Sequence, residues 1–403
     1  MGMISGIVIH WHKHFRRNFI MTESTQTFTK RTTSPFRFDV VGSFLRPQNL
    51  KDARKQFAAG SISSDQLKQV EDDAIIDLIK KEENAGLKSI TDGEFRRSWW
   101  HLDFFWGLNG VEKTALKRGY VFNDEETRAE TARLSGKITG ESHPFVEHFK
   151  FLREHLSDPK TAKQTIPAPA QFIAELYRPE NIEATNKYYS SEDELITDIA
   201  AAYKQVAIDL YDAGLRVLQL DDCTWGMLAG SHAGAKNGTN TIDQATLDAD
   251  KELYVKINNA FIEGLPADLI VNTHDCRGNY HSTWASAGGY DSVADPLFTE
   301  EKVHSYFLEY DSDRAGGFEP LAKVKDDQLV VLGLITSKNG ELEDKQTIID
   351  RIHEAAKYVP LDRLCVSTQC GFASTEEGNV LTEDQQWAKI ELVKEVAKDV
   401  WGD

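Results

Sequence analysis

Four residues of the kinds that bind metal ions lie far apart in this sequence. They are His274 and Cys276 in Val-Asn-Thr-His-Asp-Cys, Glu309 in Tyr-Phe-Leu-Glu-Tyr, and Cys370 in Thr-Gln-Cys-Gly-Phe. Each follows an apolar run rich in β-formers. Zinc accepts imidazole, thiolate and carboxylate ligands together, and a site with one exchangeable ligand can bind a substrate. The sequence therefore predicts a Zn²⁺ site made of these four side chains.

The His-x-Cys spacing is the more specific part of this pattern. Side chains two residues apart at the end of a strand point to the same face, which suits chelation. A buried cysteine beside a hydrogen-bonded histidine explains the pair equally well when it is taken alone. Glu309 and Cys370, each at the end of a later apolar run, favour the metal site. The other two cysteines, Cys223 and Cys365, are interpreted as small core residues.

Short apolar runs alternate with longer amphipathic segments from about residue 38 to the end, which indicates βαβ units and a parallel sheet. Eight strands predict an α/β fold of the (β/α)8 TIM-barrel class, with catalytic residues at the C-terminal ends of the strands. The expected strands are 38–42, 87–91, 164–167, 215–220, 268–273, 302–308, 329–335 and 363–367. The clearest helices are 64–85, 192–213, 245–263, 344–356 and 383–400.

Polar side chains recur just beyond these runs, where the mouth of a barrel would gather them. Each taken singly is also explained as a helix cap or loop end. Their recurrence favours a functional site more than any single member does. Besides the four metal-binding candidates, they are Ser43, Asp92, Glu94, Asp221, Asp222, Thr336 and Lys338.

Residues 35–403 are expected to form one domain, with an insertion after the second strand at about 96–163. Long ordered excursions in compact domains tend to be lids or binding loops, and this one carries Trp99, Trp100 and Trp106. Residues 1–34 are expected to be a disordered leader. A second methionine, Met21, opens a polar run within it.

Charge and cysteine content exclude several classes of protein. There are 46 Lys and Arg against 64 Asp and Glu, a formal net charge of -18, so nucleic acid is not an expected partner. Four cysteines in 403 residues do not make a disulfide scaffold. No apolar run is long enough to cross a membrane. We expect a cytoplasmic protein, and a homo-oligomer is compatible with the sequence.

At these residues the chain resembles the catalytic barrel of cobalamin-independent methionine synthase, including its short single-barrel relatives. The resemblance runs from Val41 onward through most of the chain. Its motifs are Val-Gly-Ser-Phe (41–44), Asp-Gly-Glu (92–94), Leu-Gln-Leu-Asp-Asp (218–222), Thr-His-Asp-Cys (273–276), Glu309 and Gln-Cys-Gly (369–371).

The resemblance implies an S-methyltransferase that makes methionine from homocysteine. It implies zinc bound by His274, Cys276, Glu309 and Cys370, and a homocysteine whose amino and carboxylate groups contact Ser43, Glu94 and Asp221. The donor implied is 5-methyltetrahydropteroyl(tri)glutamate.

The chain departs from the family on the donor side. At the seventh strand the family carries a histidine where this chain has Thr336, and the 166–172 segment Ile-Pro-Ala-Pro-Ala-Gln-Phe lacks the tryptophan that would stack on a pterin. Candidates for the donor side are Thr336, Lys338, Trp99 and Trp100. We therefore expect thiol binding to be kept and methyl-folate turnover to be weak. The alternatives are a different small thiol, a methyl-corrinoid donor, or a zinc- or thiol-binding protein without catalysis.

Overall fold

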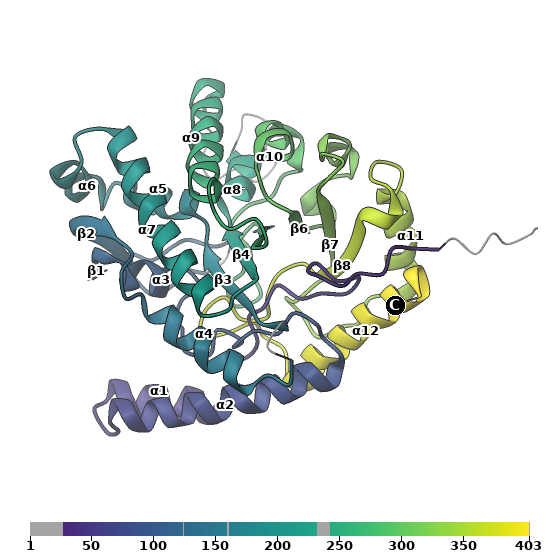
Figure 1. The fold of residues 1–403 in the computed structure, drawn as a ribbon, viewed down its shortest axis with the longest axis horizontal. Helices are drawn as coiled ribbons and strands as arrows, with labels where there is room; N and C mark the ends of the chain where they lie inside the picture. The colour runs from purple at the N-terminus through teal and green to yellow at the C-terminus, as the bar shows by residue number, and fades with distance from the viewer. Residues whose placement is uncertain (1–26, 124, 159–160, 232–241, 403) are drawn as a thin grey trace, which may run out of the picture.

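The computed structural model describes residues 27–123, 125–158, 161–231 and 242–402. Its centre is a six-stranded parallel sheet in the order β3-β4-β5-β6-β7-β8 (Figure 1). The six strands are β3 (Lys163–Pro167), β4 (Val217–Asp222), β5 (Ile270–Asp275), β6 (Ser305–Glu309), β7 (Leu329–Ile335) and β8 (Leu364–Thr368). Their sequential order, with helices between them, confirms the predicted (β/α)8-barrel class.

The first two expected strands are extended segments joined to the sheet by single bridges. Phe38 pairs in parallel with Val366 in β8, and Ile90 pairs with Ala162, the residue before β3. The two segments also contact each other, because the Thr91 hydroxyl donates to the Gly42 carbonyl at 2.6 Å. The six regular strands are thus flanked at both edges by the segments that the sequence assigned to strands one and two.

The strands β4 and β5 each lie two residues further along the chain than the sequence predicted. β4 and β5 each end two residues later than the apolar pattern indicated, so Asp221 and His274 belong to the strands themselves. Apolar runs underestimate these strands because their last residues are polar side chains that serve the site.

The predicted helices are all present, with small changes at their ends. They are α2 (Ser64–Ala85), α7 (Glu192–Asp212), α9 (Gln244–Ile262), α11 (Lys345–Ala355) and α12 (Glu383–Trp401). α2 begins with a reciprocal capping box between Ser63 and Gln66 and ends at Gly86, whose φ of 86° suits glycine. The shorter helices are α1 (Gln48–Ala58), α5 (Pro169–Leu176), α6 (Ile182–Tyr188), α8 (Thr224–Ser231) and α10 (Ala294–Glu300).

The described parts of the 96–163 segment, residues 96–123, 125–158 and 161–163, lie against the barrel. It contains α3 (Leu102–Gly107), an antiparallel hairpin of β1 (Asn109–Ala115) and β2 (Glu130–Thr139), and α4 (Pro144–His155). The backbone N–H of Asn123 donates to the Trp284 carbonyl at 2.8 Å. The insertion thereby contacts the loop that follows β5.

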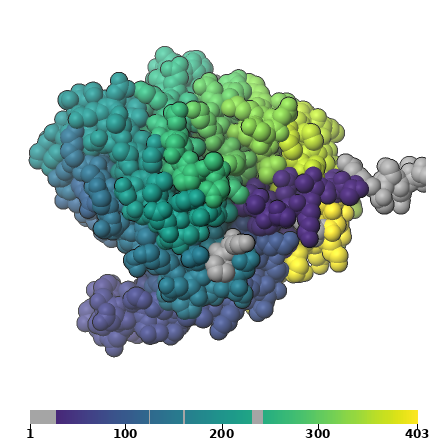
Figure 2. Space-filling view, in the orientation of Figure 1, coloured from purple at the N-terminus to yellow at the C-terminus, as the bar shows by residue number. Residues whose placement is uncertain are grey.

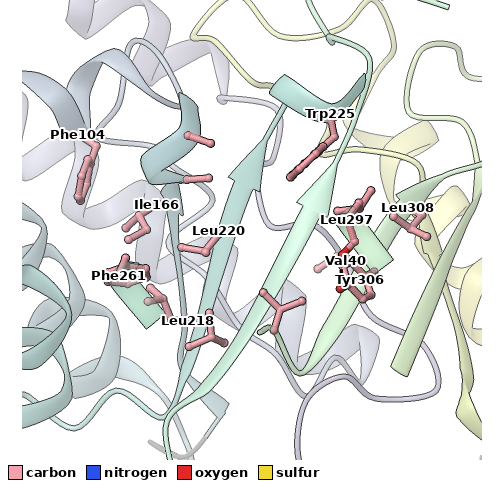
Figure 3. Close-up of a cluster of buried hydrophobic side chains, with 14 of the residues drawn as sticks. Val40, Phe104, Ile166, Leu218, Leu220, Trp225, Phe261, Leu297, Tyr306 and Leu308 are labelled. Atoms are coloured by element: carbon pink, nitrogen blue, oxygen red, sulfur yellow. Dashed lines mark hydrogen bonds between the residues drawn. The ribbon is translucent and has the colours of Figure 1, made fainter. Parts of the chain in front are cut away.

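The sheet has an apolar outer face and a mixed inner face. Leu218 and Leu220 alternate with Gln219 and Asp221 along β4, and the leucines join the large core between strands and helices (Figure 3). On the inner face, Phe307, Val331 and Cys365 form a separate small cluster. The burial of Cys365 confirms that cysteine as a core residue.

A buried lysine lies on the inner face beside that cluster. The Lys163 ammonium donates to Asp39 Oδ1 at 3.2 Å and Gln219 Oε1 at 3.3 Å, and also to the Val40 carbonyl. Gln219 in turn donates to Asp221 Oδ1 at 2.8 Å. The interior of the barrel therefore carries a polar chain that ends at a predicted site residue.

Residues 27–34, which the sequence assigned to a leader, contact the barrel; residues 1–26 lie outside the described part. Thr29 donates through its backbone N–H to Asp362 at 2.8 Å. The Arg37 guanidinium binds the same carboxylate and lies 5.4 Å from the ring centroid of Trp401. In Figure 2 this purple segment lies against the C-terminal part of the chain. Within the described residues, no helix has both the length and the apolar character needed to cross a bilayer.

Candidate active site

Three of the four predicted metal ligands converge at the C-terminal ends of β5 and β8. The ligand atoms of His274, Cys276 and Cys370 all lie within 4.8 Å of one another, and all three residues are buried. His274 Nδ1 lies 3.2 Å from the Phe307 carbonyl, so Nδ1 carries the proton and donates it there. Nε2 then presents a lone pair, and this buried nitrogen has no hydrogen-bond partner. An imidazole oriented in this way, with two sulfurs beside it, fits a zinc-type ion.

Neighbouring sulfurs and burial raise the pKa of both clustered cysteines. Contact with Cys223 and burial place the pKa of Cys276 well above the usual range, and contact with Cys276 and burial do the same for Cys370. Both can ionise together only where a cation compensates their charge. The donor set therefore suits an ion that binds thiolates.

Glu309 is not in this cluster. It is fully buried at the end of β6, where its carboxylate accepts from Arg314 at 2.5 Å and from the backbone N–H of Arg277 at 3.0 Å. Burial alone would raise the pKa of Glu309, but Lys338, Arg277 and Arg314 outweigh it and lower that pKa to about 2. Glu309 is an ionised carboxylate near the cluster, and its role as a ligand stays a prediction.

Cys223 joins the site instead of the core, so its interpretation as a core residue is wrong. Its Sγ lies 3.1 Å from Cys276 Sγ, and the residue is only partly buried and lines the cavity. The apolar run before it suggested a core position. The signal for a site position is that Cys223 follows Asp221 and Asp222 directly, as Cys276 follows His274 and Asp275 on the next strand.

Glu94 and Asp221 face the same cavity from two different segments. Glu94 Oε1 accepts from Thr165 at 2.9 Å and Arg97 at 3.1 Å, whereas Oε2 is buried without a partner. Glu94 also has a φ of 62°, which is uncommon for a residue with a side chain and typical of functional loops. The unpartnered oxygen is available to a ligand.

The two carboxyl groups influence each other's charge. Burial raises the pKa of Glu94 to about 7, with Arg97 opposing the shift and Asp221 adding to it. Burial likewise raises the pKa of Asp221 to about 7, opposed by Gln219, Arg97 and Lys163. Two desolvated carboxyls that resist ionising together form a site for a cation, which would relieve their repulsion.

The cavity that joins these groups has a volume of about 860 Å³. Ser43 lines it next to Cys370, and a Cβ on Gly371 would lie 1.9 Å from Ser43 Oγ, so only glycine permits this approach. Cavity walls thus bring together the sulfur cluster, both carboxylates and Ser43. The lining includes His274, Cys276, Cys370, Cys223, Glu94, Asp221 and Ser43.

The donor-side candidates divide into two groups. Trp99 and Trp100 line the cavity, although the Trp99 indole N–H donates to Glu130 Oε2 at 2.6 Å and its ring packs 5.8 Å from that of Tyr120. Thr336 and Lys338 are not among the described residues of the lining. The Lys338 ammonium donates instead to Asn279 Oδ1 at 3.0 Å, which supports the loop after β5.

Residues 36–398 match the family described as "Cobalamin-independent synthase, Catalytic domain". The chain belongs to this family. Within the cobalamin-independent synthase family, it has relatives of closely similar length. The protein named "Uncharacterized protein YxjG" from Bacillus subtilis (strain 168) is 44% identical over 385 residues, covering 94% of this chain and 98% of the relative.

Two solved structures of similar fold agree with the family assignment. The putative vitamin-B12 independent methionine synthase from Listeria monocytogenes is 37% identical, with a TM-score of 0.70 over 93% of this chain and 100% of that one. A B12-independent methionine synthase from Shewanella sp. W3-18-1 in complex with selenomethionine is 20% identical, with a TM-score of 0.67 over 90% of this chain and 97% of that one. Together with the family match, the likeness to the Listeria protein supports a methyltransferase of the methionine synthase type, whereas the Shewanella structure shows the shared fold.

Proposed function

We propose that this protein is a zinc-dependent S-methyltransferase that converts homocysteine to methionine. The observation that carries the proposal is the opening of two sites into one cavity. One site holds the imidazole and sulfurs of His274, Cys276 and Cys370, and the other holds the carboxyl pair of Glu94 and Asp221. A thiol amino acid has a sulfur for the first and an ammonium for the second.

The chain's own residues would position the amino acid. An ammonium group placed between Glu94 Oε2 and Asp221 would supply the positive charge that the buried pair lacks, through charge-assisted hydrogen bonds. Ser43 Oγ, on the same wall as Cys370, is proposed to contact the amino or carboxylate group.

Zinc would be held by His274, Cys276 and Cys370, with Glu309 as the proposed exchangeable fourth ligand. When bound, the ion would lower the pKa of a thiol that is otherwise near 8.5, so that the substrate reacts as thiolate. Glu309 would have to leave Arg314 to act as a ligand, whereas its ionised state already suits the task.

On the donor side, this chain departs from the residues that the family resemblance implies. By the family resemblance, Thr336 replaces a histidine, and its backbone N–H donates to Glu343 at 2.8 Å. The aromatic cavity wall of Trp99 and Trp100 is the proposed donor surface, since aromatic faces offer a large contact area at low entropy cost.

We therefore expect methyl-folate turnover well below ~1 per second, the lower end of typical enzyme rates. The measurement is methionine formation by zinc-loaded protein with homocysteine, offering methyl-folate (mono- and polyglutamate) and methylcobalamin in turn. Methyl-folate turnover at an ordinary enzymatic rate would show that this expectation is wrong. Activity with another thiol only, or zinc binding without transfer to any thiol, would overturn the proposed function.

Binding of L-methionine at several pH values tests the contribution of the carboxyl pair without any contribution from thiol ionisation. L-methionine has an ammonium and no ionisable thiol, so its affinity depends on the ionisation of Glu94 and Asp221, whose pKa values are about 7. We expect its Kd to rise as the pH falls below 7, by up to about tenfold per pH unit for each carboxyl that must lose a proton. Calorimetric titrations at pH 8, 7 and 6 measure this. A flat profile would contradict the proposed contact.

The same raised pKa values have the opposite effect on the free protein. Between the ordinary carboxyl pKa and about 7, the folded chain keeps protons that the unfolded chain releases. The pair's contribution to stability therefore increases as the pH falls through that window. Thermal unfolding of ligand-free protein, compared with a Glu94→Gln variant, separates this contribution from those of other groups.

A further inference from the structure

A fourth sulfur lies beside the cluster, and the proposed reaction does not use it. Cys223 Sγ is 3.1 Å from Cys276 Sγ. Among the described residues, Cys223 is not part of the group whose ligand atoms all lie within 4.8 Å of one another. Its sulfur therefore flanks a predicted ligand and does not complete the ligand set.

The backbone holds the two cysteines at a distance that a disulfide spans. On the adjacent parallel strands β4 and β5, Asp222 pairs with Asp275, and the two cysteines are the next residues on each side. Neighbouring strands lie about 4.8 Å apart, which is within the ~4.4 to 6.8 Å between Cα atoms that disulfides need. Closing the bond requires the sulfurs to approach by about 1 Å, to the ~2.05 Å of a disulfide.

The pair is also reachable from solvent. Both cysteines line the cavity, and Cys223 is partly exposed whereas Cys276 is 4% exposed. A small oxidant that enters with the substrate therefore meets Cys223 first, and the nearest thiol to the product of that reaction is Cys276.

We propose that Cys223 and Cys276 are an oxidative modification site, at which hydrogen peroxide converts the two thiols to a disulfide. In the first step the Cys223 sulfur bonds to a peroxide oxygen as the O–O bond breaks, giving a sulfenic acid and one water. In the second, the Cys276 sulfur attacks that sulfur and the S–O bond breaks, giving the disulfide and a second water. The peroxide takes up the two electrons, and both thiol protons leave in the water.

The consequence for metal binding depends on the proposed function. Cysteine binds zinc as the thiolate, so a disulfide at Cys276 removes one of the three clustered ligands. Oxidation would then release the ion and stop thiol activation, and a dithiol reductant would restore both. Disulfide formation itself depends only on the sulfur geometry.

The positions of lysine and arginine allow the bond to be mapped directly. Trypsin cleavage after Arg216 and Lys236, and after Lys256 and Arg277, places Cys223 and Cys276 alone in two separate peptides. Cys365 and Cys370 both lie in a third peptide, 364–389. Metal-free full-length protein is treated with hydrogen peroxide, remaining thiols are alkylated, and the non-reduced digest is analysed by mass spectrometry.

We expect a linked 217–236/257–277 species that dithiothreitol separates and that a Cys223→Ala variant lacks. A Cys365→Ala variant, which changes a buried cysteine away from the cluster, should still form it. Linkage of Cys276 to the 364–389 peptide, or irreversible oxidation of Cys223 without a link, would overturn the proposal.

A second measurement tests the coupling to the metal in the zinc-loaded protein. With a colorimetric zinc indicator, peroxide should release about one ion per chain, and Cys223→Ala should slow that release at least tenfold. Equal zinc release from both proteins would overturn the proposed link between disulfide formation and metal loss. The peptide map would then still decide whether the disulfide forms. Protein that takes up no zinc would instead overturn the proposed function, and the peptide map would still decide this inference.

Discussion

Replacing Cys370 by serine should lower the zinc content of the purified protein from about one ion per chain to well under half an ion. Homocysteine-dependent methyl transfer should fall by ~10³-fold or more, since the ion is asked to supply several kcal/mol of charge stabilisation. The reason is geometric: Cys370 is one of only three described side chains whose ligand atoms gather within 4.8 Å. Metal analysis after zinc loading and a methionine-formation assay measure the two effects.

The chain offers a matched control five residues earlier. Cys365 is buried on β8 in the small apolar cluster with Phe307 and Val331. Cys365→Ser makes the same chemical change away from the His274, Cys276 and Cys370 group, so this variant should keep its full zinc content. Full metal content and activity in Cys370→Ser would rule out the proposed centre.

Replacing Glu94 by glutamine should weaken homocysteine binding while leaving zinc binding unchanged. Glutamine keeps the shape of the side chain and replaces a carboxylate that faces the cavity. Hydrogen bonds to charged groups contribute ~1.5 to 3 kcal/mol, so Kd should rise ~10- to 150-fold. Calorimetry with the zinc-loaded variant measures the change.

The ligand provides the control for this prediction. 4-Mercaptobutyrate has the thiol and carboxylate of homocysteine but no ammonium, so its affinity should be nearly equal for wild type and Glu94→Gln. If the variant loses affinity for both ligands alike, Glu94 does not bind the ammonium and its role is to hold Arg97 and Thr165.

The sequence predicted most of the fold because its periodicities are strong. α2 has the predicted bounds, and its capping box can be read from the order of residues alone. The extended segments at 38–42 and 87–91 were identified, but their single bridges were not. A pattern of apolar residues records burial and does not record how many ladder hydrogen bonds a segment makes.

The site was predicted where chemistry is specific to the residue type. Histidine and cysteine two residues apart at a strand's end indicated the cluster, and the structure brings Cys370 to them. Glu309 lies outside the cluster, where it forms an ion pair with Arg314. Arg314 is five residues further along the chain, and no periodic pattern in the sequence predicts that ion pair. Cys223 was missed for a similar reason: its contact with Cys276 depends on the register of β4 against β5, which is a property of the folded sheet.

The polar chain inside the barrel has a consequence for engineering this protein. The interiors of such barrels are usually filled with branched apolar side chains, and substituting them for Lys163 and Gln219 would be an obvious route to greater thermal stability. Here those residues connect Asp39 to Asp221. An apolar interior would remove a donor to Asp221 and a nearby positive charge, so under the proposed function a more heat-resistant variant should bind its amino-acid substrate less well. Thermostability and substrate recognition are therefore in conflict at the same two positions.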